Sequence, residues 1–252
     1  MILLRSLLYQ IIFIGSTLYY SSAIILAGRL GASTETVGRL GCAWGLFNLA
    51  ALRRICGLTY RIQGSENLPA EGQTVIALCK HQSTWETVAL RGLFPPTQSW
   101  VLKQELMRLP FFGWALAQQQ PIALDRSDAR RSVIKLIRDG EKLLAAGRWV
   151  IIFPEGTRVA PGVRQPYNIG GALLAEKSGY PVLPIAHNAG YFWGRRSFIK
   201  HPGTIDLVIG PMIQTKGRKS TEINAEVEEW IESTVASLPK REGFDREVAE
   251  RD

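Results

Sequence analysis

The chain has 252 residues with 46% hydrophobic content, which is enough to bury a full core, and we expect one domain plus a short attachment. Its 30 Lys and Arg residues outnumber its 22 Asp and Glu residues, which leaves a net charge of +8 and suits an anionic partner. The sequence contains no basic run interleaved with aromatic residues and no zinc-finger, RNP-type or helix-turn-helix pattern. Nucleic acid is therefore the least favoured partner, and a membrane surface or a phosphorylated substrate is favoured.

The amino-terminal segment is apolar enough to enter a membrane. Leu7–Ala27 carries no charged residue over about 20 residues, the length that a helix needs to cross a bilayer core. A second apolar stretch, Leu40–Leu52, is too short to cross, and two helices dipping into one leaflet would account for both stretches. The alternatives are a core helix at Leu40–Leu52 and a cleaved signal peptide at the start, although the first stretch is longer than a usual signal-peptide core.

Basic residues and cysteines indicate the compartment. The pair Arg53–Arg54 follows the second apolar stretch, and basic residues commonly lie at the cytoplasmic headgroup level. Cys42, Cys56 and Cys79 have no CxxC spacing, which predicts neither disulfides nor a zinc site and fits small buried side chains in a reducing compartment. We therefore expect residues 1–57 to anchor the protein to the cell inner membrane, with the rest of the chain on the cytoplasmic side.

From residue 58 onward, short β-rich runs alternate with helical stretches. This alternation predicts an α/β fold, a mixed central sheet of about seven strands flanked by helices, with active-site loops at strand ends. We expect this domain to cover residues 58–238 and a charged tail to cover 239–252. Helices are expected at Asp128–Ala146, capped by Ser127 or Asp128, and at 221–238. The expected strands are Leu58–Gln63, Thr74–Cys79, Ser99–Leu102, Pro121–Leu124, Trp149–Phe153, Val182–His187 and Thr204–Ile209.

A histidine and a carboxylate follow the strand expected to end at residue 79, a place where functional loops are common. Glu86 comes five residues after His81. Within one helix the two side chains would lie about 140° apart, so they can meet only if His81 lies in a turn before a helix capped by Ser83 or Thr84. In that case Glu86 would fix the imidazole tautomer and leave the other nitrogen to deprotonate a hydroxyl. Taken alone, the spacing fits a structural histidine better.

A second group of polar residues follows the strand expected at Trp149–Phe153. The turn after it contains the permissive Gly156, the hydroxyl of Thr157 and the fixed cation of Arg158. Arg158 could hold a phosphate with two hydrogen bonds, and backbone N–H groups around Gly156 could face an oxyanion. An ordinary turn with a surface arginine is the alternative.

Together, the two groups resemble the glycerolipid acyltransferase family, and most closely its bacterial 1-acylglycerol-3-phosphate acyltransferases. The resemblance rests on His81-x4-Glu86 and on the hexapeptide Phe153–Arg158, which is a specific match. The family's first motif is usually Asn-His-x-Ser-x-x-Asp, whereas Lys80 and Glu86 stand here at the positions of Asn and Asp. Further residues resemble the family's second and fourth blocks: Lys103, Glu105, Leu106, Pro110, Phe112, Gly113, Pro121, Ile122 and Arg126, and then Val182–Ile185.

The resemblance implies that a lysophosphatidate hydroxyl attacks the thioester of acyl-CoA or acyl carrier protein, which forms phosphatidic acid. His81 would act as general base and Glu86 would orient it. No metal, no cofactor beyond the acyl thioester and no acyl-enzyme is implied. Because a dianion needs more than one cation, we expect Arg158, then Arg126 and Lys103, to bind the phosphate. The other residues expected at the substrate site are Glu155, Gly156 and Thr157.

Other acceptors and functions remain open at this level. The acceptor could be lyso-ornithine lipid, glycerol 3-phosphate or another lysophospholipid, and a non-catalytic lipid-binding membrane protein would not need His81. A metal-dependent hydrolase is disfavoured because the sequence lacks an HExxH motif. We interpret His187 and His201 as structural. The basic stretch Arg195–His201 is expected to be a solvated loop, with binding to lipid or to the acidic face of a carrier protein as the alternative.

Overall fold

The computed structural model describes residues 1–125 and 127–244, so that the expected contact of Arg126 and most of the expected tail lie outside the described residues. In the described part, seven strands form one sheet in the order β1-β7-β6-β2-β5-β3-β4. All neighbours are parallel except β6 and β7, which are antiparallel, so β1 and β7 run against the other strands. The mixed seven-stranded sheet expected from the sequence is confirmed. The strands are β1 Leu58–Gln63, β2 Ile76–Cys79, β3 Gln98–Lys103, β4 Ile122–Leu124, β5 Trp149–Ile152, β6 Val182–His187 and β7 Gly203–Ile209.

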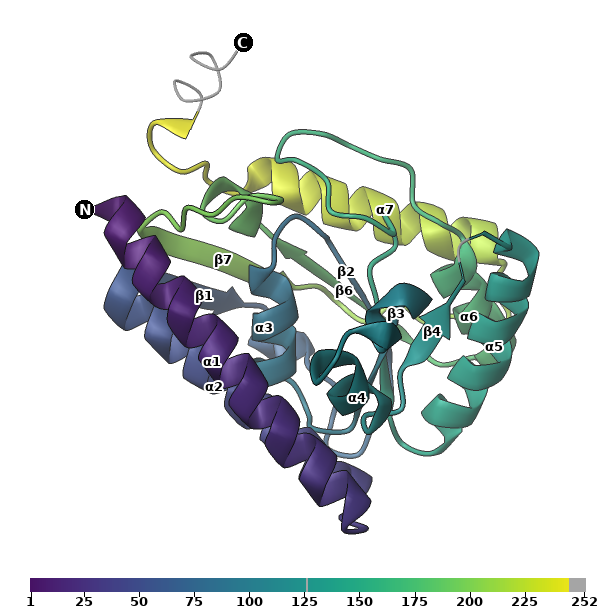
Figure 1. Cartoon of the computed structure of the whole chain (residues 1–252). Helices are drawn as coiled ribbons and strands as arrows, with labels where there is room; N and C mark the ends of the chain where they lie inside the picture. The colour runs from purple at the N-terminus through teal and green to yellow at the C-terminus, as the bar shows by residue number, and fades with distance from the viewer. Residues whose placement is uncertain (126, 245–252) are drawn as a thin grey trace.

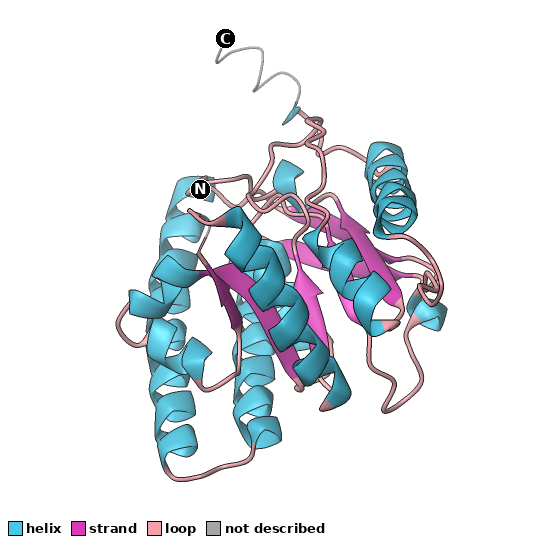
Figure 2. Cartoon of the chain, turned by 90° about the vertical axis from the view of Figure 1, so that its right-hand side faces the viewer, coloured by secondary structure: helices cyan, strands magenta, loops and turns pink. Residues whose placement is uncertain are grey.

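Helices cover both faces of this sheet (Figures 1 and 2). Successive side chains of a strand point to opposite faces. In β2, Ala77 packs in the core shared with α1, α2 and α3, whereas Ile76 and Leu78 pack against α5, α6 and α7. The helices are α1 Ile2–Arg29, α2 Thr34–Ala51, α3 Trp85–Leu93, α4 Phe112–Ala117, α5 Ala129–Ala145, α6 Gly170–Ser178 and α7 Ser220–Ser237, with shorter helical turns η1 Leu52–Cys56, η2 Ser65–Asn67, η3 Gln104–Arg108 and η4 Ala189–Tyr191.

Helix ends follow the local sequence where a strong signal exists. The Asp128 side chain accepts a hydrogen bond from the backbone N–H of Arg131 at 2.9 Å, which caps α5 as expected. The helix expected at 221–238 is α7. Helix α6 lacks a strong local signal and was not among the expected helices, because it has no side-chain cap and opens with two glycines. A Cβ at Gly171 would lie 2.8 Å from the Leu78 side chain, so the glycine allows α6 to pack close to β2.

The first two helices form a hairpin along one side of the domain (Figure 1). Within the described residues, α1 is the one helix that is long and apolar enough to cross a membrane. Several of its polar residues face protein: Asn48 of α2 donates to Ser16 at 3.1 Å, and Trp44 donates to Thr17 at 3.2 Å. Many of its aliphatic side chains are exposed, so α1 has one side against the domain and one side available to lipid.

The expectation that Lys200 lies in a solvated loop is wrong. Lys200 is fully buried, and its Nζ donates to the side chain of Gln10 and to the carbonyl of Phe198, both at 2.8 Å. The ammonium also lies 4.9 Å from the centroid of the Trp193 ring. A lysine stem can be buried when its charged head keeps polar and aromatic partners. Lys200 therefore fastens the 198–201 segment to α1.

Candidate active site

Four neighbouring parallel strands, β6, β2, β5 and β3, end at the same edge of the sheet. Their carboxyl ends lead to His187, to Lys80 and His81, to the turn Phe153–Arg158, and to Lys103, respectively. Ligand sites in α/β sheets usually lie at such an edge. Strand pairing thus brings together residues that are far apart in the chain.

His81 and Glu86 meet as the sequence analysis requires. The Nδ1 atom of His81 lies 2.8 Å from Oε1 of Glu86, and α3 begins only at Trp85, so His81 lies in the turn before the helix. The same carboxylate oxygen accepts the backbone N–H of Ser83 at 2.8 Å and that of the preceding residue at 2.9 Å. Ser83 Oγ accepts from the Trp85 N–H at 3.0 Å, whereas Thr84 makes no capping hydrogen bond. These bonds fix the carboxylate against the imidazole.

The protonation of this pair follows from its surroundings. Burial raises the pKa of Glu86, but His187, the hydrogen bond from His81 and the Ser83 N–H lower it, and the net pKa is below the ordinary value. An ionised Glu86 accepts the proton of His81 Nδ1, which leaves a lone pair on Nε2. The His81 ring stacks on Phe153 at a centroid distance of 4.0 Å, and its side chain is 14% exposed. Nε2 is therefore held in place and can accept a proton.

A second histidine lies behind Glu86, where no local sequence signal placed it. His187 is fully buried, and burial lowers its pKa while the carboxylate of Glu86 opposes this shift. Its Nδ1 accepts the N–H of Ala189 at 3.2 Å, so the proton is on Nε2, which donates to the Lys80 carbonyl at 2.8 Å. Nε2 is also 3.8 Å from Glu86 Oε2, an oxygen without a hydrogen-bond partner among the described residues. The pairing of β2 with β6 creates this contact.

A buried ion cluster supports His81 from the side away from the cavity. We call it the Lys80 centre: Lys80, Glu155, Glu232 and Tyr167. Lys80 Nζ lies 2.7 Å from Glu155 Oε1 and 2.7 Å from Glu232 Oε1. The Tyr167 hydroxyl donates to Glu232 at 2.7 Å, and Glu155 Oε2 accepts the backbone N–H of His81 at 2.6 Å. Burial raises the pKa of Glu155 to about 7 even though Lys80 lowers it.

The residues of the turn after β5 have two different surroundings: one belongs to the Lys80 centre, and three line the cavity. Glu155, which we expected at the substrate site, is 1% exposed and does not line the cavity. One of its carboxylate oxygens contacts Lys80, and the other accepts the backbone N–H of His81. Gly156, Thr157 and Arg158 line the cavity as expected. The N–H of Gly156 donates to the Phe153 carbonyl at 2.9 Å, so the N–H groups available to an oxyanion are those of Thr157 and Arg158, which have no partner among the described residues.

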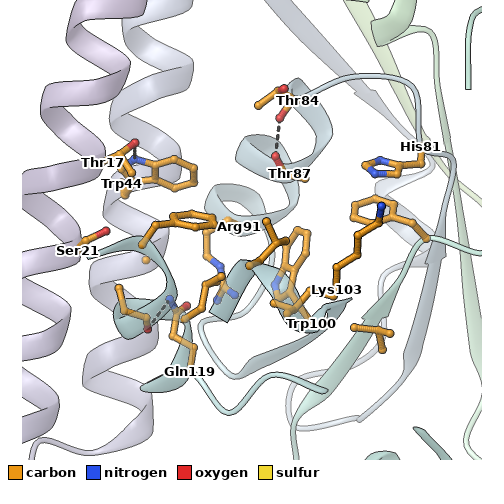
Figure 3. A pocket seen from close by; sticks show the side chains of 18 of the residues that line it. Thr17, Ser21, Trp44, His81, Thr84, Thr87, Arg91, Trp100, Lys103 and Gln119 are labelled. Atoms are coloured by element: carbon orange, nitrogen blue, oxygen red, sulfur yellow. Dashed lines mark hydrogen bonds between the residues drawn. The ribbon is translucent and has the colours of Figure 1, made fainter. Parts of the chain in front are cut away.

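The cavity has a volume of about 630 Å³ and extends from His81 to α1 and α2 (Figure 3). The cations that line it are Arg91, Lys103, Arg158, Arg195 and Arg196, and none of the described lining residues is a carboxylate. Arg195 and Arg196 were expected in a solvated loop, with binding to lipid or to a carrier protein as the alternative, and both line the cavity. Much of the remaining wall is apolar and includes Phe13, Ile24, Trp44, Trp100, Val101, Leu102, Leu106, Phe112, Leu116 and Phe153.

Other chemistries find little support in the described part of the chain. It contains no group of three or more His, Cys, Asp or Glu side chains placed to hold a metal ion. Cys56 and Cys79 are buried and Cys42 is half-buried, and all three are free thiols outside the described cavity wall. The arrangement instead offers a base, a fixed carboxylate, free N–H groups and an electropositive, partly apolar cavity.

Comparisons with known proteins identify the family and the fold. The family model described as Acyltransferase matches residues 59–188. The chain is 45% identical over 198 residues to the 1-acyl-sn-glycerol-3-phosphate acyltransferase of Pseudomonas aeruginosa, which covers 77% of this chain and 76% of that protein. It is 30% identical over 143 residues to the Helicobacter pylori protein of the same name, covering 55% and 60% of the two chains. The crystal structure of the 1-acyl-sn-glycerophosphate acyltransferase PlsC from Thermotoga maritima shares the fold, with a TM-score of 0.78, 24% identity and coverage of 95% and 97%.

Proposed function

The chain belongs to the acyltransferase family, and we propose that this acyltransferase moves a fatty acyl group to the sn-2 hydroxyl of 1-acylglycerol 3-phosphate and forms phosphatidic acid. The observation that carries the proposal is the His81–Glu86 pair beside a cavity that is lined by five cations and by a largely apolar wall. Such a cavity fits a molecule with a phosphate at one end and a hydrocarbon chain at the other. The relatives from Pseudomonas aeruginosa and Helicobacter pylori are named for the same acceptor.

In the proposed reaction His81 acts as general base. Its Nε2 takes the proton of the acceptor hydroxyl while the hydroxyl oxygen attacks the thioester carbonyl carbon. The new C–O bond forms, the C–S bond breaks, and the proton passes from the imidazolium to the departing thiolate. Glu86 holds the tautomer and stabilises the imidazolium, since it is ionised and 2.8 Å from Nδ1. Transfer is direct and needs neither an acyl-enzyme nor a metal.

The turn after β5 and the cations provide the remaining groups. The N–H groups of Thr157 and Arg158 are free to donate to the oxyanion that forms on the thioester carbonyl. Lys103, Arg158, Arg195 and Arg196 bind the acceptor phosphate, with Arg126 expected to join them. A lyso-ornithine acceptor carries one carboxylate beside an ammonium group, so this concentration of cations favours the phosphate dianion.

The buried residues behind the pair position it. Glu155 accepts the His81 N–H and is itself held by Lys80, so the Lys80 centre fixes the backbone of the base. His187 faces the second oxygen of Glu86 at 3.8 Å. Because Glu86 is one methylene longer than the aspartate usual in the family, this contact limits the rotation of the longer side chain.

The acyl donor is a thioester of CoA or of acyl carrier protein. Both donors present the same reacting group, and the exposed Arg195 and Arg196 can attract the phosphates of CoA or the acidic face of the carrier. A side-by-side assay with both donors distinguishes them.

We place the enzyme on the inner membrane, with its catalytic domain on the cytoplasmic side. Exposed aromatic residues of α4 and the turn before it, Phe111 and Trp114, extend the apolar surface of α1, which contacts α4. Such a surface fits insertion into one leaflet. The exposed apolar residues of α1 are Ile2, Leu3, Leu4, Leu7, Leu8, Ile11, Ile14, Leu18, Tyr19 and Leu26.

The proposal is tested with purified protein in detergent micelles and a labelled acyl donor. Wild-type protein is expected to acylate 1-acylglycerol 3-phosphate much faster than the monoacylglycerol that lacks the phosphate. His81→Ala should lower kcat by about 10³-fold, since a general base contributes roughly 10²–10⁴. His201→Ala removes a histidine outside the cavity and serves as the matched control. Full activity of His81→Ala, or equal rates with both acceptors, would contradict the proposal.

A further inference from the structure

The apolar part of the cavity contains one buried guanidinium without a counter-ion. Arg91 lies near the end of α3, is 6% exposed and lines the cavity (Figure 3). Its Nη1 has no hydrogen-bond partner among the described residues, and no described carboxylate lies within ion-pair distance. The Trp100 ring is 5.3 Å from its Cζ, which compensates for only part of the lost hydration. A buried charge of this kind is costly unless a ligand pairs with it.

Neighbouring charges do not neutralise Arg91. Burial lowers its pKa to about 10, so the group is still cationic at neutral pH. Cys42 interacts with it, but burial raises the pKa of that thiol, and Sγ donates to the Phe94 carbonyl at 3.8 Å, so Cys42 is a neutral thiol. Arg148 adds repulsion. The site therefore carries a positive charge.

An unsatisfied acceptor lies beside this donor. Gln119 is 8% exposed, its Nε2 donates to the Ala115 carbonyl at 3.5 Å, and its Oε1 has no partner among the described residues. A Cβ at Gly41 would lie 3.1 Å from Gln119 Oε1 and 3.1 Å from Arg91 Cδ. Both side chains therefore pack closely against Gly41, and Gly41 itself lines the cavity. By contrast, the nearby Thr17 hydroxyl is satisfied by Phe13 and Trp44.

We propose that Arg91 and Gln119 form a subsite for a hydroxyl group on an acyl chain, so that the enzyme prefers hydroxylated chains. A hydroxyl accepts one hydrogen bond and donates another, which matches a free N–H on Arg91 and a free oxygen on Gln119. A carboxylate would pair with Arg91 but could not donate to Gln119. The inference rests on the proposed function, because it assumes that acyl chains occupy this cavity.

The position of the subsite along the chain follows from α3. Thr84, Thr87 and Arg91 line the cavity from one face of the helix, as their spacing of three and four residues requires. Seven residues of helix rise about 10 Å, so the Cα of Arg91 lies about that far along α3 from the Cα of Thr84, which is close to His81 in the chain. The preferred hydroxyl is therefore several carbons away from the reacting carbonyl rather than at carbon 3. Either the donor chain or the chain of the lysophosphatidate can present it.

The test compares chains of equal length with and without one hydroxyl, placed at carbon 3 and at successive positions toward the middle. One arm carries the hydroxyl on the donor and the other arm on the acceptor. We expect wild-type kcat/KM to favour the mid-chain hydroxyl over the plain chain by roughly tenfold in one arm, the factor that one charge-assisted hydrogen bond supplies. Arg91→Met and Gln119→Leu should abolish that ratio. Arg130→Met removes an exposed arginine of α5 outside the cavity, and the ratio should stay at the wild-type value.

The outcomes separate the two proposals. If wild-type protein transfers plain chains but shows the same ratio as Arg91→Met in both arms, the pair is filled by water and the subsite is refuted. If wild-type protein transfers no acyl group to 1-acylglycerol 3-phosphate, the proposed function fails instead. Thermal unfolding of each variant shows that the compared proteins are folded.

Discussion

Two buried cations lie near opposite ends of α3, and their surroundings differ. Lys80 is 1% exposed and contacts two carboxylates, whereas Arg91 is 6% exposed and contacts none among the described residues. Removing one partner of a buried ion pair leaves an uncompensated charge, but removing a lone buried charge relieves its desolvation cost. The same type of substitution should therefore have opposite effects at the two places. The Lys80 centre, in which the cation is paired, holds His81 in position, whereas the unpaired Arg91 is available to a ligand.

The largest expected effect is that of Lys80→Met. It leaves Glu155 and Glu232 buried without their cation, and we expect the free energy of unfolding to fall by about 3–5 kcal/mol in urea denaturation. The kcat should fall as well, because Glu155 holds the His81 N–H. Lys135→Met is the matched control, since Lys135 is a partly exposed lysine of α5 paired with Asp139 and should cost at most about 1 kcal/mol. Equal losses in both variants would contradict a structural role of the Lys80 centre.

The next largest expected effect is the pH dependence of the free energy of unfolding, which tests the Lys80 centre through Glu155. Burial raises the pKa of Glu155 to about 7, so between about pH 4.5 and 7 the folded protein keeps a proton that the unfolded chain has released. Stability should therefore fall as the pH rises through this range, by up to about 3 kcal/mol from this group. Glu155→Gln removes this contribution. Urea denaturation of both proteins at pH 5, 6, 7 and 8 checks it, and parallel curves would show that Glu155 has no raised pKa.

The smallest expected effect is an increase in the free energy of unfolding, opposite in sign to the effect of Lys80→Met. Arg91→Met replaces an unpaired buried charge by an apolar chain, and we expect the free energy of unfolding to rise by about 1–2 kcal/mol. For a domain of this size the corresponding rise in Tm is about 2–4 °C per kcal/mol. Differential scanning calorimetry without substrate measures it. A drop in Tm would mean that Arg91 has a stabilising partner in the free enzyme, and the comparison with Lys80 would fail.

Much of the fold could be predicted because its signals are local. The strands lie where apolar runs are bounded by turn residues, and the central ones read as continuous apolar runs because both faces are covered. The Asp128 cap marked α5 for a similar reason. At the candidate site, the contact of His81 with Glu86 and the turn Phe153–Arg158 also follow from local spacing. The contact is confirmed, while the catalytic and binding roles of these residues stay predictions.

The sequence by itself therefore determined the elements and the two chemical motifs, because each depends on residues a few positions apart. Tertiary structure decided what surrounds them. Lys80 meets Glu232 across 152 residues, and His187 reaches the Lys80 carbonyl across 107. The hydrophobic periodicity of the sequence cannot predict such contacts, because they depend on strand order and helix packing. For the same reason, only the folded chain shows that Glu155 turns away from the cavity and that Arg91 lies in it without a partner.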